Sequence, residues 1–211
     1  SGRIKELTVF TSVDTFGEQA EYARNGLDFP LWQKRVDELL SKTTKLSIAI
    51  MSTFNALSVL RYGDLLDWVF EMKCNHNSPD RHWVTALTLD SAYLRYPHHQ
   101  TVKILPKEFR ERMEELATQA ETLHTVIPLW EIEDWKDHYL GFTQIEIGKI
   151  KRIIDWFDEE VEEETLNKTR RDFYNFISAH DKRRGTNFQE TFPELVDFFN
   201  QCKKLNEEFL Q

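Results

Sequence analysis

Three short runs of apolar and β-branched residues stand out in the first half of the chain. They are residues 7–11, 46–51 and 83–89, and polar residues follow each of them. Short apolar runs bounded by polar residues are typical of buried strands. We therefore expect three strands, which stop at the polar stretches 12–14, 52–55 and 90–91.

Between these runs, apolar residues recur at helical spacing. The pattern predicts helices within residues 18–24, 31–40 and 57–72, and Pro30 suits the first turn of the second of these. Strands that alternate with helices indicate parallel βαβ units. The fold class is therefore α/β.

After Pro106 the pattern becomes helical throughout. Apolar residues at helical spacing mark 109–123, 145–157, 173–177 and 195–205. We expect two parts, an α/β unit over 1–105 and a mainly α-helical extension over 106–211.

Charge and cysteine content narrow the function classes. The 211-residue chain has a net charge of −9, which disfavours binding to nucleic acid or to an anionic membrane, although a local basic patch is still allowed. No apolar run is long enough to span a bilayer. Cys74 and Cys202 favour two thiols in a reducing, cytoplasmic setting; a disulfide between them is left open.

Polar side chains lie where the predicted strands end. Ser12 and Asp14 follow the first, Asn55 follows the second, and Asp90 follows the third. Ligands of parallel α/β folds bind at the carboxyl ends of strands, so these residues predict a rim for a polar ligand. The alternative for each residue is a cap on the following helix.

Several stretches resemble one enzyme family. The similarity is to the radical S-adenosylmethionine enzymes, in particular those with a SPASM or twitch extension. The stretches are 10–14, 22–27, 53–59, 94–100, 181–186 and 191–195.

The resemblance implies a partial (β/α) barrel, of which this chain is the C-terminal half. By the same resemblance, Ser12 and Asp14 would face the sulfonium and ribose end of the cofactor, and Arg24 would pair with its carboxylate. Asn55 would bind the ribose or the methionine part, and the strand end at Leu94 would meet the adenine.

One signature of the family is absent. Its Cys-x-x-x-Cys-x-x-Cys motif holds a [4Fe-4S] cluster, and no such motif occurs here. We therefore expect S-adenosylmethionine and the cluster in an intact enzyme, and neither cofactor nor activity in this chain alone. Ser1-Gly2 looks like a cloning remnant, with the natural chain entering at about Arg3.

Expected partners follow from this hypothesis. They are a peptide or another polar substrate, a missing N-terminal half, or a second copy of the chain. The alternatives are a non-enzymatic α/β interaction module and a subunit that pairs with a separate cluster-bearing chain.

Overall fold

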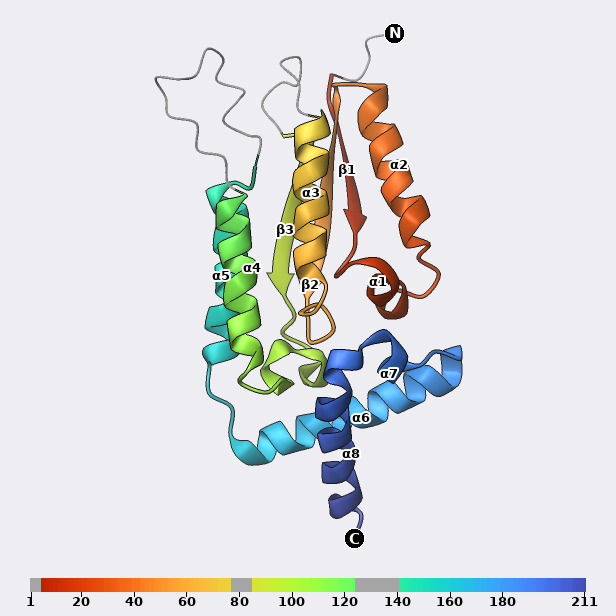
Figure 1. Ribbon diagram of the computed structural model, residues 1–211, viewed down its shortest axis with the longest axis vertical. Coiled ribbons are helices and arrows are strands. Elements are labelled where there is room, and N and C mark those ends of the chain that lie inside the picture. The colour runs from red at the N-terminus through yellow and green to blue at the C-terminus, as the bar shows by residue number, and fades with distance from the viewer. Residues whose placement is uncertain (1–4, 77–84, 124–140) are drawn as a thin grey trace.

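A computed structural model describes residues 5–76, 85–123 and 141–211. The described part is a mixed α/β fold with much more helix than strand (Figure 1). Its elements run in the order β1 (Leu7–Ser12), α1 (Gly17–Ala23), α2 (Phe29–Lys42), β2 (Leu46–Phe54), α3 (Tyr62–His76), β3 (Leu87–Tyr93), η1 (His98–Gln100), η2 (Val102–Ile104), α4 (Phe109–Thr122), α5 (Gln144–Asp158), α6 (Glu163–Arg184), α7 (Phe188–Thr191), η5 (Pro193–Leu195) and α8 (Val196–Phe209).

The three strands form a parallel sheet in the order β1-β2-β3, which confirms the predicted α/β class and the parallel pairing. In the register, Ser12 lies beside Met51, and Met51 lies beside Asp90. A (β/α) barrel is not seen in the described residues; they contain this small open sheet.

The sheet buries one of its faces. Ile48, Ile50 and Leu89 are at most 1% exposed, and they alternate along the strands with more exposed residues. Figure 1 shows α2 and α3 beside the strands, and both helices contact the sheet. Trp32 of α2 donates from Nε1 to Thr11 Oγ1 of β1 over 2.8 Å, which ties this helix to the edge strand.

All three strands run further than the sequence predicts, β1 by the single residue Ser12. β2 continues to Phe54, and β3 continues through Asp90 and Ser91 to Tyr93. The prediction was wrong because it took polar residues as strand ends. Ser91 is buried, with its Oγ 2.6 Å from the Tyr62 hydroxyl of α3, so a distant partner allows the strand to continue. Residues 83 and 84 of the predicted third strand lie outside the described residues.

The second half is helical, as predicted, and it packs on the sheet as well as on itself. α5 contacts β3, α4 contacts α5, and α6 contacts α8. In Figure 1, α6, α7 and α8 lie beyond the carboxyl ends of the strands. None of the described helices is long and apolar enough to cross a membrane.

Candidate functional site

Among the described residues, the face of the sheet opposite α2 and α3 is left partly exposed. Its members alternate with the buried residues, and we call this surface the open face; it consists of Thr8, Phe10, Ser12, Ser47, Ala49, Met51, Thr53, Thr88, Asp90 and Ala92. Phe10 is 69% exposed and Met51 is 38% exposed. Parallel sheets are usually covered on both faces, so this partly exposed, mainly polar face, from which Phe10 and Met51 protrude, is a candidate binding surface.

Asp14 and Arg24 meet at the carboxyl end of β1. The Arg24 guanidinium donates from Nε to Oδ2 and from Nη2 to Oδ1 of Asp14, each over 3.0 Å. This is the bidentate geometry that makes arginine–carboxylate pairs strong and directional. Asp14 Oδ1 also accepts the backbone N–H of Thr53 over 2.8 Å, so the same carboxylate joins the ends of β1 and β2.

Asn55 binds the carbonyl of the same residue, Thr53. Its Nδ2 donates to the Thr53 carbonyl over 2.9 Å, and its Oδ1 accepts the Leu57 N–H over 2.9 Å. The second contact closes a local turn, and it is not a helix cap because α3 begins only at Tyr62. Arg24, Asp14 and Asn55 are therefore linked through the backbone of Thr53.

The two remaining predicted residues lie at the margins of this cluster. Ser12 is exposed on the open face, at the end of β1. Leu94 donates its backbone N–H to Phe54 O over 2.9 Å, which places the end of β3 beside the end of β2. All five predicted site residues thus lie at the carboxyl edge of the sheet, and the unforeseen feature is that Asp14 and Arg24 bind each other.

Asp90 belongs to the open face and not to a strand end. Its Oδ1 lies 2.6 Å from Nζ of Lys149, which reaches it from α5. Side-chain exposures of 36% for Asp90 and 30% for Lys149 leave both groups partly accessible. Sequence reasoning missed Lys149 because α5 was expected to belong to a separate helical extension.

The motif at 181–186 anchors α1, the helix that leads to Arg24. Asp181 Oδ1 accepts the Tyr22 hydroxyl over 2.8 Å and the Thr186 hydroxyl over 2.7 Å, while Oδ2 accepts the Phe188 N–H over 2.8 Å. Burial, reinforced by the hydrogen bond to Asp181, raises the pKa of Tyr22, so its hydroxyl stays a proton donor. This motif therefore fixes the helical end of the chain to the candidate site.

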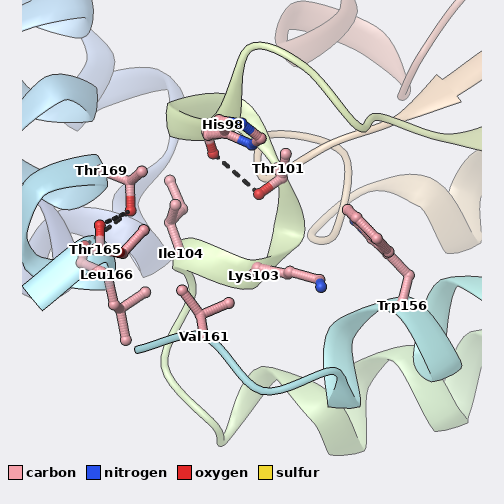
Figure 2. A pocket seen from close by; sticks show the side chains of 9 residues that line it. All are labelled: His98, Thr101, Lys103, Ile104, Trp156, Val161, Thr165, Leu166 and Thr169. Atoms are coloured by element: carbon pink, nitrogen blue, oxygen red, sulfur yellow. Dashed lines mark hydrogen bonds between the residues drawn. The ribbon is translucent and has the colours of Figure 1, made fainter. Parts of the chain in front are cut away.

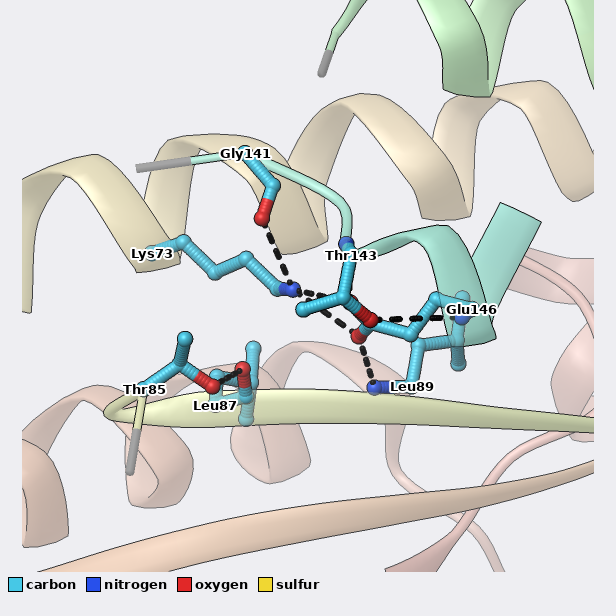
Figure 3. A network of polar contacts seen from close by, with 7 residues as sticks. All are labelled: Lys73, Thr85, Leu87, Leu89, Gly141, Thr143 and Glu146. Atoms are coloured by element: carbon cyan, nitrogen blue, oxygen red, sulfur yellow. Dashed lines mark hydrogen bonds and ion pairs between the residues drawn. The ribbon is translucent and has the colours of Figure 1, made fainter. Parts of the chain in front are cut away.

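A buried ion pair positions α5 beside β3. Nζ of Lys73 on α3 lies 2.8 Å from both carboxylate oxygens of Glu146 and 3.2 Å from the Gly141 carbonyl oxygen (Figure 3). Glu146 also accepts the N–H of Leu89, an edge group of β3, and closes a capping box with Thr143. The pKa of Lys73 is lowered because burial desolvates its ammonium. The network covers part of the free edge of the sheet.

A separate cavity of about 210 Å³ lies between η1, η2, α5 and α6. Its walls are mainly apolar, and Figure 2 shows the residues that line it, which are His98, Thr101, Lys103, Ile104, Trp156, Val161, Thr165, Leu166 and Thr169. The Thr101 hydroxyl donates to the His98 carbonyl, and the Thr169 hydroxyl donates to the Thr165 carbonyl. These two hydroxyls are thus already bonded, whereas Nε1 of the wall residue Trp156 is buried without a partner in the described part of the chain. The cavity contains none of the predicted site residues.

Metal ligands are not assembled in the described residues, which contain no group of three or more His, Cys, Asp or Glu side chains placed to hold an ion. Cys74 is exposed and Cys202 is buried, and no disulfide joins them. Comparisons with protein-family models, with curated proteins and with solved structures found no match to this chain.

Proposed function

We propose that this chain provides one wall of an S-adenosylmethionine pocket in a radical enzyme, and that it is inactive without the part that carries the iron-sulfur cluster. The observation that carries the proposal is the convergence of Arg24, Asp14 and Asn55 on Thr53, next to an open sheet face. The sequence resemblance supplies the identity of the cofactor.

The polar groups at this edge suit the cofactor. The Arg24 side chain is 37% exposed and uses Nε and Nη2 for Asp14, so within the described residues Nη1 is left to bind the carboxylate of the methionine part. The Ser12 hydroxyl, exposed on the open face, would bind the ribose. Asp14 would act as the positioning group for Arg24. When bound and reductively cleaved, the sulfonium cofactor supplies radical chemistry to a neighbouring substrate.

The cluster does not fit the cysteines of this chain. A [4Fe-4S] cluster needs three or four thiolates close together, whereas this chain has two cysteines in total. Cys202 is buried on α8 and Cys74 is exposed on α3. Under this proposal the cluster comes from elsewhere, and the chain holds the cofactor from the opposite side. The proposal therefore assigns this chain the C-terminal half of a partial (β/α) barrel, with the open face toward the interior.

The free side of β1 favours a second reading, in which the chain is a subunit that pairs with another polypeptide. Leu7 and Phe10 on this edge strand are 48% and 69% exposed. Edge strands with apolar side chains readily pair with further strands. A second polypeptide that supplies the cluster would pair with this edge strand and cover the open face.

The test is a titration of the ¹⁵N-labelled 211-residue chain with S-adenosylmethionine, followed by NMR. We expect weak binding, because half of the pocket is missing, with shifts at Asp14, Thr53 and Asn55. Arg24→Gln should abolish these shifts. The matched control is Arg35→Gln, which removes an exposed ion pair with Glu38 on α2. Shifts that are absent at millimolar cofactor, or that are identical in the Arg24 variant, would refute the proposal.

A further inference from the structure

We infer that the open face binds a free α-amino acid with an apolar side chain, and that Asp90 and Lys149 recognise its ammonium and carboxylate groups. The inference deepens the proposed function and rests on it in one respect, because it takes the open face as the substrate side of the pocket.

The Asp90–Lys149 pair has bonding capacity left for a ligand. An ammonium group has three donors, and Lys149 Nζ uses one of them on Asp90 Oδ1. Within the described part of the chain, Asp90 Oδ2 accepts no hydrogen bond. The pair therefore offers two donors and one acceptor site beside each other on an accessible surface.

The pair is held in place before any ligand arrives. Lys149 lies one turn after Glu146, whose carboxylate is bonded to Lys73 and to the Leu89 N–H. Leu89 directly precedes Asp90 on β3, so the network in Figure 3 holds in place the strand and the helix from which Asp90 and Lys149 extend. Groups that are already positioned bind a ligand with less loss of conformational entropy.

The charges favour a zwitterion over a simple ion. A lone anion would be repelled by Asp90 and by the net charge of −9, and a lone cation would be repelled by Lys149. A ligand that carries both charges next to each other satisfies both groups. An α-amino acid has this arrangement.

The surface next to the pair suits an apolar side chain. Met51 lies directly beside Asp90 in the register, and Ala49 and Phe10 lie beside each other one row away. Neighbouring strands are about 4.8 Å apart, so a medium-sized side chain reaches from Asp90 across β2. Ala49 is small, and Phe10, its partner in the register, is 69% exposed, so this row offers accessible apolar surface.

The experiment compares three probes by NMR on the labelled 211-residue chain. L-phenylalanine carries both charges, N-acetyl-L-phenylalanine lacks the ammonium, and L-phenylalaninamide lacks the carboxylate. We expect shifts at Thr88, Asp90 and Ala92, and about tenfold weaker binding of each blocked probe.

Substitutions test whether the Asp90–Lys149 pair binds the ligand, as opposed to another charged residue of α5. Asp90→Asn and Lys149→Gln should each weaken L-phenylalanine binding about tenfold. The control is Lys151→Gln, because Lys151 pairs with Glu121 on α4 and should leave binding unchanged. Both target side chains are partly exposed, so the variants should fold.

Two outcomes would overturn the inference. One is equal affinity for the three probes, and the other is a loss of S-adenosylmethionine shifts at Asp14 and Thr53 in Lys149→Gln, which would assign the pair to the cofactor. Binding of L-phenylalanine that persists without any binding of S-adenosylmethionine would support the inference and refute the proposed cofactor.

Discussion

Replacing Lys73 by methionine tests how the buried ion pair stabilises the fold. Methionine keeps much of the length of the lysine side chain but removes its charge. The Lys73 side chain is 0% exposed and that of Glu146 is 7% exposed, so the substitution leaves a carboxylate buried without its counter-charge. Breaking a buried pair in this way usually costs about 3–5 kcal/mol.

The remaining hydrogen bonds of Glu146 determine where in that range the loss of stability should lie. Its carboxylate keeps three hydrogen bonds, from the N–H and hydroxyl of Thr143 and from the N–H of Leu89. These bonds compensate part of the charge, so we expect Lys73→Met to lower the free energy of unfolding by about 3 kcal/mol. The double variant Lys73→Met/Glu146→Gln, which has no buried charge, should lose less than the sum of the two single variants.

Urea unfolding monitored by circular dichroism measures these differences. The control is Lys168→Met, which removes an exposed ion pair with Asp172 on α6 and should change the free energy of unfolding by less than about 1 kcal/mol. A loss of under about 1 kcal/mol in Lys73→Met, or strict additivity in the double variant, would refute the reasoning.

Three further outcomes are expected. Gly185→Ala should destabilise by about 1 kcal/mol, measured by urea unfolding, because Gly185 has a φ of +66° at the end of α6. Gly148→Ala, inside α5 with open space around it, should instead stabilise by about 0.5–1 kcal/mol in the same assay. Burial, and to a smaller extent the nearby Arg184, lower the pKa of His180 below its ordinary value of 6.5. As the pH falls, His180 is therefore protonated at a higher pH in the unfolded chain than in the folded chain. Thermal unfolding should therefore show stability falling below about pH 6.5, less steeply in His180→Phe; parallel profiles would contradict this.

The sequence pattern predicts elements well where a single local signal determines them. Apolar runs located all three strands, and Pro30 marked the start of α2, where Asp28 is the cap. The capping box of Thr143 and Glu146 is also a local signal, and it explains why α5 begins at Gln144.

The features that the sequence pattern did not predict depend on contacts between residues that are far apart in the chain. β3 continues through Asp90 and Ser91, and the partners of these two residues, Lys149 and Tyr62, are 59 and 29 residues away in the sequence. Lys73 lies within an apolar helical pattern, where a charged residue is ordinarily solvated, and its partner Glu146 is 73 residues further on. The sequence was enough to name polar residues at the carboxyl edge of the sheet as candidates. The contact between Asp14 and Arg24 could not be predicted in this way, because it depends on how β1 and α1 are placed in space.

The hydrogen bond from Tyr22 to Asp181 couples the C-terminal helices to α1, near the opposite end of the chain. Tyr22 lies two residues before Arg24, so loss of the Asp181 contact would free the last turn of α1 and loosen the hold of Arg24 on Asp14. Proteolytic removal of the segment after residue 180 should then speed amide hydrogen exchange in α1 while that in α2 stays slow. Ligands or proteins that bind the C-terminal helices would, through the same hydrogen bond, change the affinity of the sheet edge for its own ligand.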